Sequence, residues 1–225
     1  MRNCIITITG QKGSGKTSFA KQLAKKCSRL IVVDRMVEYE GDTFSNFDDA
    51  IDYLAVRWYG DCAAIIRFDN DLYYRELFRF LFYAASRCPT KPTSVIVEEA
   101  DFFCSPHAIE PNLEALFKYG RHRHINLVSI ARGDTDLHRS VLNNSDCIVS
   151  FRARKFSRDM RERFTADELE RVQSLETLTP EMEPKNGVHF LVYPPDTDPL
   201  ALWEEAQGLD IADRIEHIDI ARRES

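Results

Sequence analysis

Eight residues near the amino terminus have the spacing of a phosphate-binding loop. The stretch Gly10–Thr17 reads Gly-Gln-Lys-Gly-Ser-Gly-Lys-Thr, with four residues between the first glycine and the Gly-Lys-Thr triplet. Successive backbone N–H groups can wrap a polyphosphate only where no Cβ intervenes, which explains the glycines. The Lys16 ammonium can reach the outer phosphates of ATP, and the Thr17 hydroxyl can ligate Mg²⁺. The predicted nucleotide-binding residues are Gly10, Gln11, Lys12, Gly13, Ser14, Gly15, Lys16, Thr17 and Ser18.

Two adjacent carboxylates form a second chemical group. Glu98 and Glu99 directly follow Ser94–Val97, a short run of small and β-branched residues that reads as a buried strand. Open α/β sheets place their ligands at the carboxyl ends of strands. Glu98 would hold Mg²⁺, directly or through water, and Glu99 would orient and deprotonate an attacking water. The alternative is a strand end that carries two solvated glutamates.

Alternating strands and helices must position these groups. Strands are expected at 4–9, 30–33, 63–68, 94–97, 125–130, 146–151 and 187–193, and helices at 17–26, 47–54, 71–87, 112–119, 136–142, 157–164 and 166–174. Such alternation predicts an α/β fold with a mostly parallel central sheet and helices on both faces. The order of strands relative to the two chemical groups is that of RecA-like P-loop NTPases of the ASCE type.

Length and composition limit the classes of protein. The 225 residues suit one domain with a small extension, here a core at 1–165 and an extension at 166–225 with one strand and acidic helices. The strand expected right after Met1-Arg2-Asn3 argues against a secretory signal, and no apolar run approaches the roughly 20 residues of a membrane span. The six scattered cysteines predict reduced thiols in a cytosolic setting.

Charge is unevenly distributed along the chain. The net charge is −6, yet residues 120–163 carry ten basic and five acidic side chains, and residues 164–225 carry five basic and fifteen acidic ones. This asymmetry predicts a basic working face and an acidic face, although ordinary solvated surface explains it equally well. The six candidate contacts for a nucleic-acid backbone are Arg152, Arg154, Lys155, Arg158, Arg161 and Arg163, but the last three interleave with acidic residues as in a salt-bridged helix.

Four features in order resemble the HerA/FtsK superfamily of double-stranded-DNA translocases. They are Asp34-x-x-x-Glu38-Tyr39, Val95-Ile-Val-Glu98-Glu99-Ala100, Tyr119-Gly120-Arg121-His122-Arg123 and Ser129-Ile130-Ala131-Arg132-Gly133-Asp134. The resemblance covers about residues 3–155. The short chain looks most like the genome-packaging ATPases of tailless icosahedral viruses that contain an internal membrane.

The resemblance implies roles for individual residues. Lys16 and Thr17 match phosphate and Mg²⁺ binding, and Glu99 matches the general base. Arg121 matches an arginine finger that acts on the nucleotide of the neighbouring subunit, with Arg123 as the fallback; alternatively, Arg121 binds the carbonyls that end its helix. The implied partners are double-stranded DNA, further copies in a homo-oligomeric ring (a hexamer is favoured over a pentamer) and capsid or vertex proteins. The implied location is the host cytoplasm or the packaging vertex of the virion.

The sequence departs from the family pattern at two positions. Glu98 stands where the family usually has Asp, and Ala131 stands where it usually has the sensor Gln. Alanine cannot contact a γ-phosphate, so Arg132 is the candidate replacement.

Three other functions remain open. A cellular HerA-like DNA-processing ATPase would have the same motor residues. A P-loop kinase for a small substrate is disfavoured by the glutamate pair, which suits water activation. A nucleotide switch that does not hydrolyse ATP is compatible with the missing sensor Gln.

Overall fold

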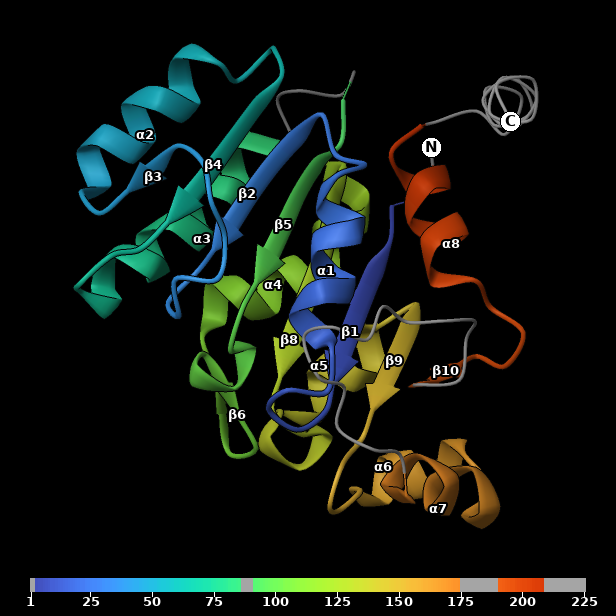
Figure 1. The fold of residues 1–225 in the computed structure, drawn as a ribbon. Coiled ribbons are helices and arrows are strands. Elements are labelled where there is room, and N and C mark those ends of the chain that lie inside the picture. Colours follow the sequence, from blue (N-terminus) through green and yellow to red (C-terminus); the bar gives the residue numbers. More distant parts are fainter. Residues whose placement is uncertain (1–2, 86–90, 175–189, 209–225) are drawn as a thin grey trace, which may run out of the picture.

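An eight-stranded sheet runs through the computed structural model, which describes residues 3–85, 91–174 and 190–208 (Figure 1). Its strand order is β10-β9-β1-β8-β5-β2-β4-β3. All neighbouring strands are parallel except β10, which is antiparallel to β9. The strands are β1 (Ile5–Thr9), β2 (Arg29–Val33), β3 (Thr43–Phe44), β4 (Cys62–Ile66), β5 (Thr93–Val97), β8 (Ile125–Ala131), β9 (Cys147–Phe151) and β10 (Phe190–Tyr193).

Both faces of this sheet are covered by helices, as expected for strands that are apolar along their whole length. Ile5 of β1 packs into one core and Ile6 into the other, because side chains alternate along a strand. The first core lies under α2 (Phe47–Val56), α3 (Asp71–Ala85), α4 (Pro111–Tyr119) and α5 (Arg139–Asn144). The second lies under α1 (Lys16–Ala24) and α8 (Pro199–Ala206). The predicted α/β architecture is confirmed.

Several helices begin at residues with the expected chemistry. The Asn46 side chain accepts hydrogen bonds from the backbone N–H groups of Asp48 (2.8 Å) and Asp49 at the start of α2. The Ser157 hydroxyl caps α6 (Arg158–Arg163) by accepting a hydrogen bond from the backbone N–H of Met160. Helix α6 is followed by α7 (Ala166–Ser174). Local hydrogen bonding thus fixes these helix starts close to where the sequence predicts them.

The structure also differs from the sequence-based expectations. Strand β3 and the hairpin β6 (Cys104–Ser105) and β7 (Ala108–Ile109) were not predicted, because strands of two residues leave no periodic pattern. Helix α5 begins at Arg139 rather than 136, since residues 134–136 form a 3₁₀ turn. Residues 187–189 of the expected last strand, Cys88 and the acidic segment beyond Gly208 lie outside the described residues.

The residues after position 165 complete the same sheet. Strand β10 pairs with β9, and the buried Trp203 of α8 donates a hydrogen bond from its indole Nε1 to the carbonyl of Leu23 in α1 (3.0 Å). The division at residue 165 stays an interpretation of the sequence. None of the helices in the described ranges has the length and apolar content to cross a membrane.

Candidate functional site

The carboxyl ends of four adjacent parallel strands bring the predicted groups to one edge of the sheet. The P-loop follows β1, Arg132 follows β8, Glu98 follows β5 and Asp34 follows β2. In Figure 1 this edge lies at the lower end of the strands, where the P-loop enters α1. An open α/β sheet presents its ligand sites at this edge.

The P-loop has the backbone geometry that its glycines allow. Gly10, Gly13 and Gly15 have positive φ angles of 150°, 75° and 98°, which side chains with a Cβ rarely adopt. The Ser14 hydroxyl donates to the carbonyl of Gln11 at 2.8 Å, and the Lys16 ammonium donates to the same carbonyl at 2.9 Å. The loop is therefore held in a closed turn at the amino terminus of α1, the place where helix N–H groups bind anions.

Gly10 is also required by its neighbour β9. A Cβ at Gly10 would lie 2.6 Å from the Cβ of Phe151, closer than such atoms approach in proteins. The next residue, Gln11, donates its backbone N–H to the carbonyl of Arg152 at 2.7 Å. The P-loop is thus fastened to the segment that leaves β9.

Lys16 lies among the acidic residues of the neighbouring strand ends. Burial lowers the pKa of its ammonium, while Glu98, Asp101 and Glu99 counteract that shift. These opposing effects show that three carboxylates lie within electrostatic reach of the lysine. An ammonium in this position can bind a phosphate that enters the loop.

Glu98 is a buried carboxylate with only 4 % of its surface exposed. Burial raises its pKa to about 7, and the nearby hydroxyls of Tyr39 and Thr17 counteract the rise. Thr17 and Glu98, the two residues predicted to hold Mg²⁺, therefore lie near one another. Their oxygens suit a hard cation, and Mg²⁺ at phosphates commonly takes only one or two protein ligands besides water and substrate. The described residues contain no cluster of three or more metal-binding side chains, so the fit rests on Thr17 and Glu98 with a triphosphate.

Glu99 leaves the strand in an unusual backbone conformation. Its φ and ψ are both 49°, the left-handed region that few residues other than glycine adopt. This turn starts the 3₁₀ segment Ala100–Phe102 and leaves Glu99 partly exposed, in contrast to Glu98. A partly exposed carboxylate beside the P-loop can contact a water molecule, as a general base must.

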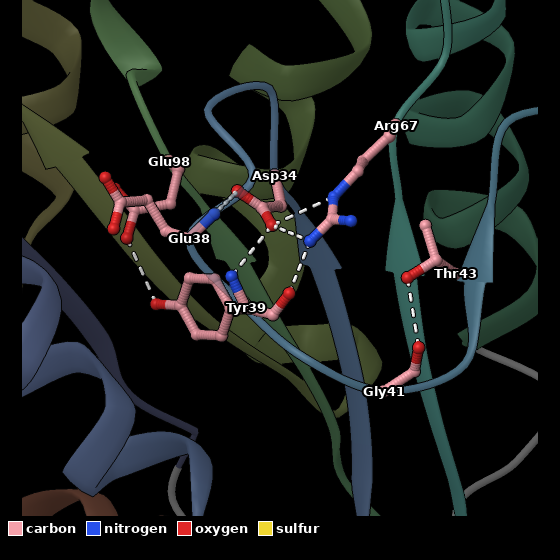
Figure 2. A network of polar contacts seen from close by, with 7 residues as sticks. All are labelled: Asp34, Glu38, Tyr39, Gly41, Thr43, Arg67 and Glu98. Carbon is pink, nitrogen blue, oxygen red and sulfur yellow. Dashed lines mark hydrogen bonds and ion pairs between the residues drawn. The ribbon is translucent and has the colours of Figure 1, made fainter.

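The loop Asp34–Tyr39 follows β2 and reaches Glu98 through a side-chain hydrogen bond (Figure 2). The fully buried Asp34 accepts hydrogen bonds from the backbone N–H groups of Glu38 (2.9 Å) and Tyr39 (3.0 Å). Arg67, at the end of β4, donates to Asp34 at 2.7 Å and to the carbonyl of Tyr39. At the other end of the loop, the Tyr39 hydroxyl donates to Glu98 Oε1 at 3.1 Å.

Arg132, the predicted sensor, pairs with a carboxylate that follows β5. Its guanidinium donates from Nε (3.0 Å) and from a terminal nitrogen (2.7 Å) to Oδ2 of Asp101. The Asp101 side chain is 5 % exposed and that of Arg132 is 66 % exposed. Ala131 is buried in the sheet opposite Thr9, and its methyl group has no polar atom to offer a nucleotide. Arg132 thus stands beside the P-loop with its position set by Asp101.

Arg121 lies away from these groups. It belongs to the 3₁₀ segment Gly120–Arg123 that precedes β8, and therefore lies at the amino-terminal edge of the parallel strands. Its guanidinium is 3.3 Å from Asp146 and donates weakly to the carbonyl of Asn144. Arg123 donates to the carbonyl of Phe82 at 3.2 Å and stacks on that ring. Neither arginine joins the P-loop of its own chain.

The basic residues after β9 divide into two groups. Arg158 pairs with Glu162 at 2.7 Å, which is the salt-bridged alternative that the sequence left open, and Arg163 donates to the Asn143 side chain. Arg154, Lys155 and Arg161 instead line a cavity of about 530 Å³ with residues of α7. The ten basic residues between positions 120 and 163 therefore do not form one uniform face.

The geometry can be compared with that of known structures. No family model matches the sequence, and no curated protein does. The genome-packaging NTPase B204 from Sulfolobus turreted icosahedral virus 2, solved with AMP, is similar at a TM-score of 0.62 and 21% identity, over 85% of this chain and 92% of that one. The DNA-packaging ATPase B204 from Sulfolobus turreted icosahedral virus is similar at 0.58 and 19%, over 79% and 90%. The chain has the fold of a viral genome-packaging NTPase. At this identity the likeness establishes the fold alone.

Within this NTPase fold, two contacts at the site were missed from the sequence. Asp101 anchors Arg132, and its place two residues after Glu99 on the same strand end was the available signal. Arg67 anchors the loop Asp34–Tyr39, but nothing in the sequence links it to Asp34, 33 residues earlier. Only the parallel pairing of β2 with β4 brings those two residues together.

Proposed function

We propose that the chain is an ATPase that moves double-stranded DNA, in a ring of identical subunits that packages a viral genome into a preformed capsid. The observation that carries the proposal is the convergence of the P-loop, Glu98, Glu99 and Arg132 at one edge of the sheet. The fold, shared with packaging NTPases that were solved with AMP and with ATP-gammaS, supports the nucleotide part.

The residues would divide the hydrolytic work. P-loop N–H groups and Lys16 bind the phosphates. To do so, the Lys16 ammonium gives up its hydrogen bond to the Gln11 carbonyl and binds a phosphate oxygen instead. Mg²⁺ held by Thr17 and Glu98 would supply charge neutralisation on the phosphates. Glu99 accepts a proton from the attacking water, and Arg132 stabilises charge near the γ-phosphate from its anchor on Asp101.

Glu99→Gln tests the hydrolytic assignment. We expect this variant to bind ATP with wild-type affinity and to lose at least about 100-fold in ATP turnover, since it lacks the general base. Lys16→Ala should instead lose binding. Glu76→Gln, an exposed glutamate on α3, is the matched control. Turnover that survives in Glu99→Gln would contradict the assignment of the base, and a wild type that binds ATP without turnover would favour the nucleotide switch.

Stimulation by DNA tests the translocase. We expect the ATPase rate to rise when long duplex DNA is added. In the presence of ATP, we expect the mass of the protein assembly to match a closed ring of subunits. A monomer with no response to DNA would contradict the proposal, and strict dependence on a small phosphate acceptor would indicate a kinase.

Arg121 is assigned to the active site of the neighbouring subunit. Its place at the opposite edge of the sheet from its own P-loop supports a role in trans. Neither Arg121→Ala nor Glu99→Gln should hydrolyse ATP alone, but a mixture should regain activity, because some interfaces then combine an intact Glu99 with an intact Arg121. Arg139→Ala, which breaks the surface pair with Asp159, is the control. No recovery on mixing would assign Arg121 to its pair with Asp146 instead.

A further inference from the structure

The loop Asp34–Tyr39 is held more firmly than a connection between two elements requires. Asp34 is fully buried and accepts four hydrogen bonds, two from the loop backbone and two from Arg67. Arg67 adds a further hydrogen bond to the carbonyl of Tyr39. Both the start and the end of the loop are therefore tied to the guanidinium of Arg67, the residue that follows β4 (Figure 2). Charge-assisted hydrogen bonds of this kind are strong and directional.

The fixed loop presents one functional group to the nucleotide site. The Tyr39 ring is 8 % exposed, packs in the core beneath α1, and places its hydroxyl 3.1 Å from Glu98 Oε1. The Glu98 side chain has three rotatable bonds, one more than aspartate, so its carboxylate has more freedom to lose on binding an ion. A phenol that donates to Oε1 removes part of that freedom in advance.

We propose that Tyr39 is a positioning residue that orients the Glu98 carboxylate on the side of the site where Thr17 lies, with Asp34 and Arg67 as its rigid support. The inference rests on the proposed function, in which Thr17 and Glu98 meet Mg²⁺·ATP. Tyr39 itself touches neither nucleotide nor metal in this assignment. Its effect is confined to how well Glu98 is oriented for the ion, because the loop is fixed by residues on the far side from the P-loop.

Tyr39→Phe is the direct test, because it removes one oxygen and keeps the buried ring. Calorimetry with ATP in excess MgCl₂ and with ATP in EDTA separates the contribution of Mg²⁺ to ATP affinity from the affinity for ATP without the ion. We expect Tyr39→Phe to reduce the Mg²⁺-dependent gain in affinity by at least about tenfold, the effect of a lost hydrogen bond to a charged group, and to leave the affinity in EDTA unchanged. Equal loss in both conditions, or no loss, would overturn the proposal.

Tyr53→Phe is the matched control. Tyr53 donates to Asp42 and to the carbonyl of Ala63 on the outer side of the same sheet, away from Glu98. It should bind ATP like the wild type in both conditions. In a Glu98→Gln background, Tyr39→Phe should have no further effect on the Mg²⁺-dependent gain, because the two residues act through one contact.

A second variant keeps the proposal testable if Tyr39→Phe folds poorly. Arg67→Lys keeps the Tyr39 hydroxyl and loosens its support, so a smaller loss of the same Mg²⁺-dependent kind is expected. An Arg67→Lys variant with wild-type values would remove Arg67 from the proposal. Lys16→Ala separates the two hypotheses. If Lys16→Ala leaves ATP binding unchanged, the proposed function is contradicted. If ATP binding needs Lys16 but Tyr39→Phe leaves it unchanged, only this inference is contradicted.

Discussion

Glu98 is a buried carboxyl group that forms no ion pair with a lysine or arginine among the described residues. Its hydrogen bond comes from the Tyr39 hydroxyl, and Asp34 and Glu38 are close enough to oppose its ionisation. The sequence predicted that Glu98 and Thr17 hold the same Mg²⁺, because the P-loop and Glu98 both follow strands that were expected to end at one edge of the sheet. It could not predict Tyr39 as the hydrogen-bond donor to Glu98, since that contact depends on the path of a loop with no periodic pattern.

The raised pKa of Glu98 makes stability depend on pH. The folded state retains a proton up to about pH 7, whereas the unfolded chain loses it near 4.5, so Glu98 lowers the free energy of unfolding as the pH rises through this window. Glu98→Gln has no such titration. Above pH 7 the variant should be more stable than the wild type by up to roughly 3 kcal/mol, and below pH 4.5 the difference should vanish.

Urea denaturation in EDTA without nucleotide, between pH 4 and 8, measures this difference. Glu76→Gln, on the exposed surface of α3, should track the wild type throughout. A constant difference between Glu98→Gln and the wild type across the range would contradict the assigned pKa.

Gly10 is a second single residue on which the fold depends, because it packs directly against Phe151. Gly10→Ala would place its Cβ 2.6 Å from Phe151 in a backbone conformation with φ of 150°, so we expect it to destabilise the fold by at least about 2 kcal/mol. Gly60→Ala is the control, because its Cβ would find its nearest neighbour at 3.8 Å. Thermal melting of the two variants should separate them clearly; equal melting temperatures would show that β9 can move away from the loop.

At the scale of elements, the loop Asp34–Tyr39 shows where sequence reasoning stops. The pattern Asp34-x-x-x-Glu38-Tyr39 marked the segment, and the strand that precedes it was predicted within a residue of its observed end. The partner of Asp34 was not predicted, because an ion pair between two parallel strands depends on the register of β2 with β4. That register follows from the whole sheet rather than from either strand.

Removal of Arg67 tests the strength of this pair. Arg67→Met keeps much of the aliphatic volume but leaves the buried Asp34 carboxylate without its guanidinium, which should cost about 3 kcal/mol in the free energy of unfolding. Arg79→Met breaks an exposed pair with Glu76 and should cost less than about 1 kcal/mol. Denaturant titration of both gives the comparison, and equal losses would mean that solvent already screens the Asp34 pair.

At the scale of the molecule, the alternation of strands and helices predicted the α/β architecture. It did not predict the short elements β3, β6 and β7. Residues 120–163 carry an excess of basic side chains. In the folded structure, however, several of these pair with nearby carboxylates, such as Arg158 with Glu162 and Arg139 with Asp159. Linear charge counts therefore overstate the size of a basic face.

Salt dependence of DNA binding tests which cations matter. A triple change to glutamine at the cavity beside α7 should lower the slope of log affinity against log salt by about two to three units, one for each lost phosphate contact. A control with the same change of net charge elsewhere on the surface should leave the slope unchanged. The test residues are Arg154, Lys155 and Arg161, and the control residues are Arg75, Arg79 and Lys91. Equal slopes for both sets would show that binding responds only to net charge.

The hydrogen bond from Gln11 to Arg152 has a mechanical meaning. The nucleotide loop and the first residue of the segment that leads to Arg154 and Lys155 are neighbours through a single 2.7 Å contact, with Phe151 pressed against Gly10 beside it. Because close-packed groups transmit strain, a displacement of the loop would be passed to that segment without an intervening helix or hinge. Under the proposed function, this contact would couple the loop that binds ATP directly to residues that are candidates for contact with the DNA backbone.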